Sequence, residues 1–236
     1  MAPFDILAFD ADDTLWHSQD GFDAAERYFV EMLRPYVPAS VDIAAALVAT
    51  QQANLHVYGY GVKAFGLSMF EAALTLSQGR VPPDVLSRLL DVIRDLLMAP
   101  ARLLDNVPDV LGEVATSFSL VMVTKGDLVH QTRKLTTSGL EYLFDHVEIV
   151  LEKDVATYRR VFDELDVEPR RVCMVGNSIK SDALPVLELG GFAVHIAYPT
   201  LWDLERVERP PVSDRFVELD SLQALPAWLE SMRDRP

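Results

Sequence analysis

The second half of the chain alternates short apolar runs with segments of helical periodicity. Four runs, at 118–123, 147–150, 172–175 and 192–196, have the length and composition of buried strands. An earlier run at 4–9 has the same character. Strands separated by helices are joined by right-handed crossovers, and such crossovers build a parallel sheet. The sequence therefore predicts an α/β fold around a parallel sheet.

Helical patterns account for the rest of this part of the chain. We expect helices at 108–116, 128–138 and 155–165, a helix that ends at Gly190 and Gly191, and a last short strand and helix between Phe216 and Leu229. The chain has 236 residues, half of them hydrophobic, which is enough for a large core domain with an insertion.

The segment from about residue 18 to residue 98 shows helical periodicity only. Pro35 ends the first predicted helix, the second follows Ser40, and Pro82 opens the fourth. The third is expected to begin at Ser68, where Ser68 and Glu71 match a capping box. Its predecessor, the glycine-rich segment 58–66, is expected to be a loop. We therefore expect a core domain of residues 1–16 and 99–236 and a helical cap domain of residues 17–98.

Composition excludes several classes of function. The formal net charge of −15 argues against a nucleic-acid-binding protein, which needs a basic face for phosphates. Charges interrupt every apolar stretch well before the ~18 residues of a membrane span, and the first residues do not resemble a signal peptide. The single cysteine, Cys173, lies in an apolar run and is expected to be a buried, inert thiol. A cytoplasmic protein that acts as a monomer or homodimer fits these features.

Polar and charged residues follow each predicted strand directly. Asp10 and Asp12 come after the first strand, within Asp10-Ala11-Asp12-Asp13-Thr14; the later groups are Thr124-Lys125-Gly126-Asp127, Glu152-Lys153-Asp154, and Gly176-Asn177-Ser178 with Asp182. Ligands of open parallel sheets bind at the carboxyl ends of the strands. These residues are therefore expected to face one crevice.

This set of motifs resembles that of the haloacid dehalogenase superfamily, with a helical cap inserted after the first motif. Asp10, Asp12 and Thr14 match the motif DxDxT, and Thr124 matches the hydroxyl residue that ends the second strand. Lys153 matches the lysine before a helix, and the segment 176–182 matches the acidic motif. The resemblance implies a Rossmann-like parallel sheet and a hydrolase. Two positions depart from the pattern: Asn177 stands where many relatives have Asp, and Asp13 where Gly is usual.

The resemblance implies a Mg²⁺-dependent phosphatase that acts on a small phosphomonoester. Asp10 would attack phosphorus, Asp12 would act as acid and base with Thr14 orienting it, and Lys153 would offset negative charge. Phosphate oxygens would be bound by the residues that follow the second strand, Thr124, Lys125 and Gly126. Mg²⁺ would be held by Asp10, the backbone carbonyl of Asp12, Asn177 and Asp182.

Other functions remain open at this point. The same motifs serve carbon–halogen cleavage and phosphomutases, and a catalytically idle binding module could keep the fold. Asp12 favours a phosphatase, because dehalogenases need no acid or base there. In the expected loop 58–66, Tyr60 and Lys63 are candidates for contacts with the leaving group.

Overall fold

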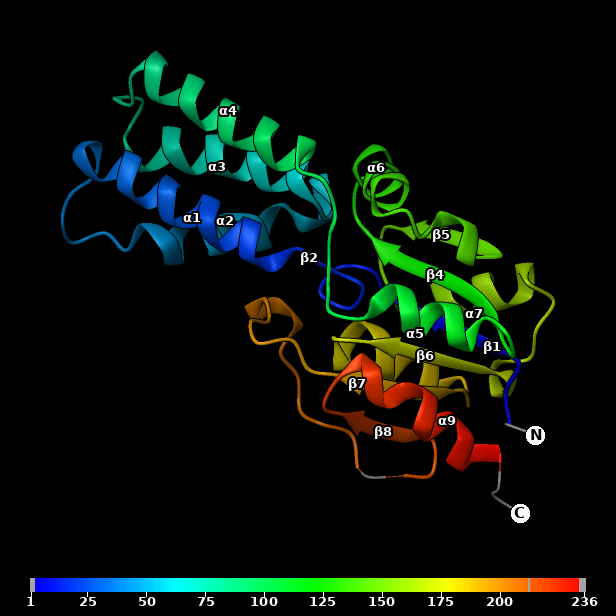
Figure 1. Ribbon diagram of the computed structural model, residues 1–236. Helices are drawn as coiled ribbons and strands as arrows, with labels where there is room; N and C mark the ends of the chain where they lie inside the picture. Colours follow the sequence, from blue (N-terminus) through cyan, green and yellow to red (C-terminus); the bar gives the residue numbers. More distant parts are fainter. Residues whose placement is uncertain (1–2, 212, 234–236) are drawn as a thin grey trace. The chain divides into compact units, whose positions relative to one another are not determined.

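The computed structural model describes residues 3–211 and 213–233, so residues 1, 2, 212 and 234–236 of the predicted core domain lie outside it. The chain divides into two compact units (Figure 1). The sheet unit comprises the described residues of segments 1–19, 101–125 and 133–236. The helical unit comprises 20–100 and 126–132.

The sheet unit is built on a six-stranded parallel sheet in the order β5-β4-β1-β6-β7-β8. Its strands are β1 (Ile6–Phe9), β4 (Ser119–Lys125), β5 (His146–Val150), β6 (Val172–Gly176), β7 (Phe192–Ile196) and β8 (Phe216–Leu219). Phe9, at the end of β1, lies opposite Met122 of β4 and Val175 of β6. Residues that follow these three central strands therefore emerge at one edge. This topology confirms the predicted α/β, Rossmann-like fold.

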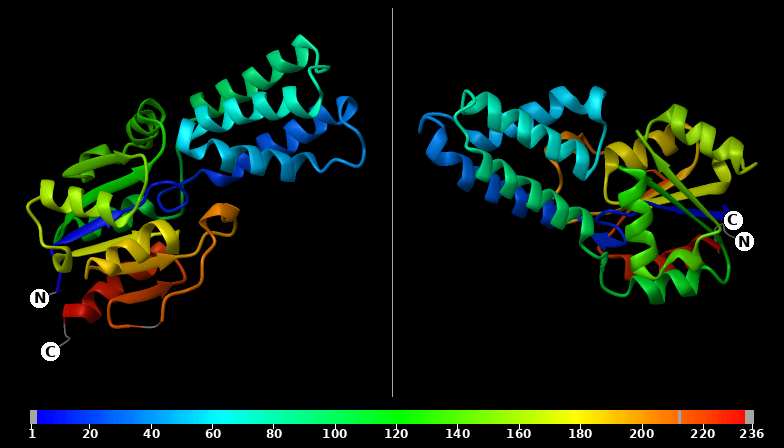
Figure 2. Two further views of the ribbon diagram at one scale, coloured as in Figure 1. Left: turned by 180° about the vertical axis from the view of Figure 1, so that it is seen from behind. Right: turned by 90° about the horizontal axis from the view of Figure 1, so that it is seen from above.

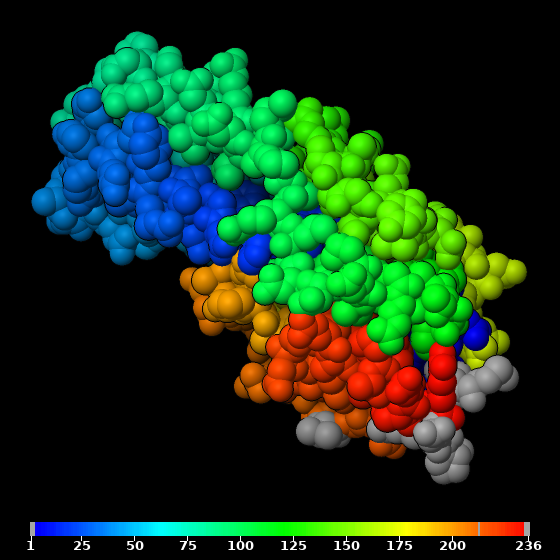
Figure 3. Space-filling view, viewed as in Figure 1, coloured from blue at the N-terminus to red at the C-terminus, as the bar shows by residue number. Residues whose placement is uncertain are grey.

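The central strands bury side chains on both faces, as expected of a parallel sheet covered by helices. Alternate residues of β1 show this division: Leu7 and Phe9 pack into one core, and Ala8 packs into the other. The first core receives α5 (Val107–Val114), α9 (Leu225–Arg233) and Leu135 of α6 (Leu128–Ser138). The second receives α7 (Val155–Glu164) and α8 (Leu184–Glu188). Figure 2 shows the strands and helices of this unit from behind and from above, and Figure 3 shows α5 and α9 side by side on its surface.

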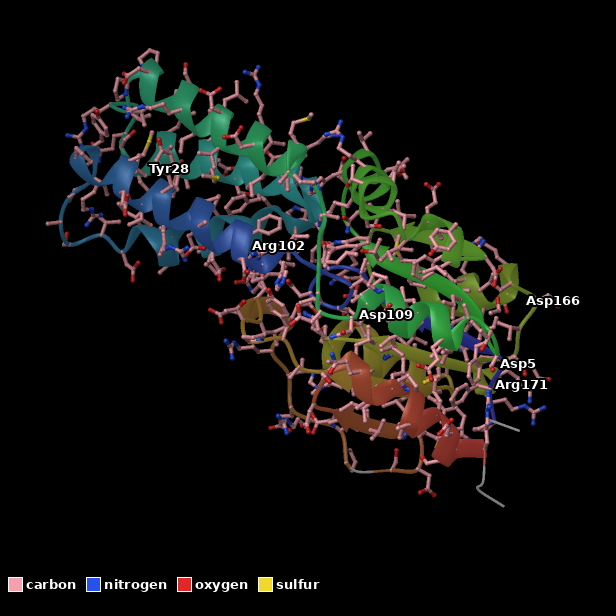
Figure 4. All side chains as sticks on the ribbon, in the orientation of Figure 1. Asp5, Tyr28, Arg102, Asp109, Asp166 and Arg171 are labelled. Atoms are coloured by element: carbon pink, nitrogen blue, oxygen red, sulfur yellow. The ribbon has the colours of Figure 1, made fainter. Side chains whose placement is uncertain are left out.

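Short elements complete the sheet unit. A two-stranded antiparallel ribbon, which the sequence did not predict, pairs Trp16 of β2 (Trp16–His17) with Leu103 of β3 (Arg102–Leu103). Single helical turns are η2 (Glu141–Leu143), η3 (Pro169–Arg171), η4 (Ile179–Ala183, a π-helical turn), η5 (Asp203–Glu205) and η6 (Leu222–Ala224). At the amino ends of β1 and β6, the side chains of Asp5 and Arg171 lie together and form an ion pair (Figure 4).

The helical unit has its own apolar core, which includes Phe29, Leu47, Met69 and Leu89. Its helices are α1 (Gln19–Leu33), which begins at the last residue of the sheet unit's first segment, then η1 (Arg34–Tyr36), α2 (Ile43–Tyr58), α3 (Val62–Leu76) and α4 (Pro83–Met98). Within the described residues of both units, no helix is long and apolar enough to cross a membrane.

The expected loop at 58–66 is wrong for most of its length, because α3 begins at Val62. Gly66 lies inside α3, where a β-carbon would lie 2.6 Å from Cδ1 of Ile93, so glycine there permits close packing with α4. The expected capping box is also wrong. Ser68 and Glu71 lie within the helix, and both accept hydrogen bonds from the side-chain amide of Asn54 on α2, at 3.3 and 2.8 Å.

Candidate active site

Asp10 directly follows β1, and its carboxylate is almost completely buried. Its backbone N–H donates to the carbonyl of Val175 at 2.9 Å, which fixes the loop to β6. One carboxylate oxygen accepts from Lys153 Nζ at 2.5 Å, and the other accepts from the hydroxyl of Thr14 at 3.1 Å. The predicted nucleophile is therefore held in one orientation by a cation and a hydroxyl group.

Lys153 bridges two carboxylates. Its Nζ also donates to Asp182 at 2.7 Å, and its side chain is only 1% exposed, so water screens the charge of the ammonium group very little. Burial raises the pKa of Asp10 to about 7. The positive charge of Lys153 opposes this rise, and the negative charge of Asp182 adds to it. Burial alone would lower the pKa of Lys153, but the two carboxylates together hold it well above its ordinary value. The structure thus brings together three of the residues that the sequence singled out.

Asp12 occupies a different environment. Its Oδ1 accepts from the indole Nε1 of Trp16 at 2.6 Å and from Nζ of Lys134 at 2.5 Å. The expectation that Thr14 orients Asp12 is wrong, because the hydroxyl of Thr14 donates to Asp10. The chain turns between Asp12 and Trp16, and this turn places Trp16 and not Thr14 against the second carboxylate.

Asp13 takes a structural part in the same turn. Its φ of 63° is in the left-handed region that Asp tolerates, and its carboxylate accepts from the backbone N–H groups of Ser18 and Gln19 at 2.8 to 3.1 Å. Burial raises the pKa of Asp13 to about 7, and these two N–H groups oppose that rise. The carboxylate thus stabilises the start of α1.

The segment after β6 is packed closely around Asp182. A β-carbon at Gly176 would lie 2.2 Å from Oδ2 of Asp182, so only glycine leaves room for that carboxylate. The same Oδ2 accepts from the backbone N–H of Ser178 at 2.9 Å. His195 on β7 hydrogen-bonds to the backbone carbonyl of Asn177 at 3.0 Å. In the described part of the chain, no residue hydrogen-bonds to the side-chain amide of Asn177, although that residue is nearly buried.

Lys125, at the end of β4, belongs to a second buried charged cluster. Its Nζ donates to Glu205 at 2.7 Å and to the hydroxyl of Ser181 at 2.9 Å. The hydroxyl groups of Ser178 and Ser181 donate to the same Glu205, and its pKa falls to about 2 because these partners outweigh its burial. Lys125 therefore lies beside Thr124 at the carboxyl end of β4, but its ammonium group forms an ion pair with Glu205.

The remaining candidates lie in the helical unit. Lys63 Nζ pairs with Asp127 at 2.9 Å, and this contact lowers the pKa of Asp127 although partial burial opposes it. Tyr60 lies just before α3. Gly126 follows β4 with a φ of +130° and opens the segment 126–132 of this unit.

Sequence reasoning missed Lys134 and Glu205. The sequence did contain a signal for Lys134. Positions 130, 131 and 134 lie on one face of α6, and they are polar where an ordinary amphipathic helix has apolar residues. The structure buries this face. Glu205 had no such signal, since it lies in a short turn within an irregular segment.

The oxygen atoms at this edge fit the divalent cation that the sequence suggested. Asp10 and Asp182 supply buried carboxylates, and Asn177 supplies an amide oxygen, which are hard ligands of the kind Mg²⁺ prefers. The space that Gly176 leaves for Asp182 fits the same purpose. Among the described residues, no group of three His, Cys, Asp or Glu side chains forms a metal site, so any such site needs Asn177 or backbone oxygens as well.

Comparison with known proteins agrees with this geometry. The model of the haloacid dehalogenase-like hydrolases matches residues 4–190. A haloacid dehalogenase-like family hydrolase from Xanthomonas campestris is 34% identical over 98% of this chain and 92% of its own, with a TM-score of 0.87. No curated protein matches the chain significantly.

More distant solved structures share the fold. A putative HAD-hydrolase from Bacillus subtilis bound to magnesium is 20% identical, covers 96% of this chain and 98% of its own, and has a TM-score of 0.66. A predicted phosphoglycolate phosphatase from Haemophilus somnus is 17% identical, covers 97% and 99%, and has a TM-score of 0.64. Haloacid dehalogenases share the fold at 18 to 19% identity. With its family model matched over most of its length, the chain belongs to the haloacid dehalogenase-like hydrolases.

Proposed function

We propose that this hydrolase is a Mg²⁺-dependent phosphatase that cleaves a small phosphomonoester through an aspartyl-phosphate on Asp10. The observation that carries the proposal is the different environment of two carboxylates that are separated by a single residue in sequence. Asp10 is buried against Lys153 and Thr14, whereas Asp12 is about a third exposed and is held by Trp16 and Lys134. Groups in such different surroundings are suited to separate roles as nucleophile and acid/base.

In the first step, a carboxylate oxygen of Asp10 attacks phosphorus and the bond from phosphorus to the leaving oxygen breaks. Asp12 gives its proton to that leaving oxygen, so the alcohol departs neutral. In the second step, Asp12 takes a proton from water, the water oxygen attacks phosphorus, and the bond to Asp10 breaks. Phosphate leaves and Asp10 is restored.

Other residues bind and orient the phosphoryl group in this scheme. Lys153 offsets the charge of Asp10, and Thr124 with the N–H groups that follow it would bind phosphoryl oxygens. Asp10, Asp182, Asn177 and the backbone carbonyl of Asp12 would hold Mg²⁺. When bound, the cation would supply positive charge that favours ionised Asp10 and offsets the negative charge of the phosphoryl group.

The presence of Asp12 favours ester hydrolysis over dehalogenation. A carbon–halogen bond releases a halide, which needs no proton, whereas an alkoxide leaving group does. The buried bridge from Lys153 to Asp10 and Asp182 argues against an idle binding module, because maintaining buried charges is costly.

We further propose that residues 17–98 act as a cap that contributes specificity through Tyr60 or Lys63. The enzyme would work on soluble phosphate esters in the cytoplasm, as a monomer or homodimer.

The decisive test measures hydrolysis of 4-nitrophenyl phosphate and of 2-chloropropionate by the same preparation, with Mg²⁺ and after chelation. We expect phosphate ester hydrolysis that requires the metal and that falls by roughly 10³-fold or more in Asp10→Asn. Release of chloride without phosphatase activity would overturn the proposal. A panel of sugar phosphates, nucleotides, phosphoglycolate and phosphorylated cofactors would then identify the substrate.

A further inference from the structure

Two donors from separate elements converge on one oxygen of Asp12. Trp16 Nε1 on β2 and Lys134 Nζ on α6 both donate to Oδ1, at 2.6 and 2.5 Å. Lys134 Nζ also donates to the hydroxyl of Ser18 at 3.2 Å and lies 5.8 Å from the centre of the Trp16 ring, within the range of a cation–π contact. Tryptophan, lysine and carboxylate therefore form one small cluster.

Both donors are fixed by packing. The Trp16 side chain is fully buried, and its backbone pairs with Leu103 of β3. Lys134 is followed on α6 by Leu135, which belongs to the core of the sheet unit. Because the Trp16 ring and the Lys134 side chain are themselves buried, both donors are confined, and together they restrict the rotation of the Asp12 side chain.

Exposure separates the roles of the two charged groups. The side chain of Lys134 is 8% exposed, whereas that of Asp12 is 32% exposed. The Lys134 side chain is thus the more deeply buried of the two, and the Asp12 carboxylate is the more accessible. This arrangement suits a residue that acts on a ligand through Asp12 without touching the ligand itself.

We propose that Lys134, with Trp16, is a positioning residue for the acid/base Asp12. Its contact with Oδ1 sets the direction in which the other carboxylate oxygen can exchange a proton with the leaving group. The proposal rests on the phosphatase function proposed above, and it adds a residue outside the matched motifs. A small displacement of a proton donor is costly because proton transfer needs hydrogen-bond geometry.

The test uses the dependence of rate on the leaving group. Phenolate is a poorer leaving group than 4-nitrophenolate and needs more protonation, so loss of a well-placed acid slows phenyl phosphate more than 4-nitrophenyl phosphate. kcat and KM are measured for both esters with the parent, Asp12→Asn, Lys134→Met and Lys134→Arg. Arg160→Met is the matched control, since it removes a half-exposed helical cation of the same unit that pairs with Glu164.

We expect Asp12→Asn and Lys134→Met each to lower the ratio of the phenyl to the nitrophenyl kcat/KM by roughly tenfold or more, because kcat/KM reports the step in which the leaving group departs, whereas hydrolysis of the aspartyl-phosphate is common to both esters. Lys134→Arg should recover much of that ratio because it retains charge and donors, and Arg160→Met should leave it unchanged. Circular dichroism verifies folding, because Lys134 contacts the Trp16 ring and its substitution would alter tryptophan fluorescence directly. Lys134→Gln, which keeps a polar group, replaces the methionine variant if that variant is unfolded.

Two results would overturn the inference, and they distinguish its own failure from failure of the proposed acid/base role of Asp12. If Asp12→Asn lowers the ratio while Lys134→Met leaves it intact or slows both esters equally, Lys134 is merely structural and Asp12 keeps its role. If Asp12→Asn itself leaves the ratio intact, the acid/base assignment fails, and the positioning role fails with it.

Discussion

The raised pKa of Asp10 predicts that replacing this residue by Asn stabilises the metal-free protein at neutral and higher pH. Burial lifts the pKa of Asp10 from 3.8 to about 7. Between these two values the folded protein binds a proton that the unfolded chain has released. Stability therefore falls as pH rises through this window. The asparagine in Asp10→Asn does not titrate, so the free energy of unfolding of this variant does not fall with pH in this way.

The size of the effect follows from the shift itself. A difference of about three pKa units corresponds to roughly 4 kcal/mol at 1.36 kcal/mol per unit. We expect the stability of Asp10→Asn relative to the parent to increase by up to about 4 kcal/mol between pH 4 and pH 8. Lys153 adds no slope in this range, because its raised pKa keeps it charged throughout.

Urea unfolding in the presence of a chelator provides the measurement. The three tryptophans, Trp16, Trp202 and Trp228, all belong to the sheet unit, so their fluorescence reports the unfolding of that unit. Asp163→Asn, a change at an exposed carboxylate on α7 of the same unit, is the matched control and should show no dependence of this kind. A stability difference for Asp10→Asn that is constant from pH 4 to pH 8 would refute the reasoning, since Lys153 would then fully compensate burial.

Three further predictions concern single buried groups. The hydroxyl of Tyr158 is buried without a hydrogen-bond partner among the described residues, so Tyr158→Phe should stabilise the protein by about 1 kcal/mol or more in urea unfolding; a loss of stability would indicate a bound water there. Gly176→Ala should displace Asp182 and weaken Mg²⁺ binding by roughly 10- to 100-fold in titration calorimetry, and unchanged binding would exclude Asp182 as a ligand. Burial raises the pKa of the Cys173 thiol, so a disulfide reagent should modify it only at the rate of unfolding; rapid labelling of the folded protein would contradict its burial.

The sheet was predictable from the sequence because its signals are local and strong. Apolar runs such as 172–175 can only be buried, and helices between such runs require parallel strands. The meeting of Asp10, Lys153 and Asp182 followed from the same topology, which brings the ends of β1, β5 and β6 to one edge.

The errors arose where packing decided the outcome. Glycine usually breaks helices, but at Gly66 the missing side chain lets α3 approach Ile93, and tertiary contact outweighs propensity. Spacing along the chain likewise could not decide between Thr14 and Trp16 as the partner of Asp12. The direction of the turn after β1 decides it, and only the folded structure contains that turn.

Lysines at the carboxyl edge of the sheet explain how a strongly acidic chain can build an acidic site. Of its five lysines, three lie there: Lys125 on β4, Lys134 on α6 and Lys153 before α7. Lys125 pairs with Glu205 and Glu152, Lys134 pairs with Asp12, and Lys153 pairs with Asp10 and Asp182. Five carboxylates therefore face three ammonium groups, which leaves two negative charges in excess. An aspartate in place of Asn177 would raise that excess to three, so Asn177 limits the repulsion that folding must overcome while it retains an oxygen for the cation.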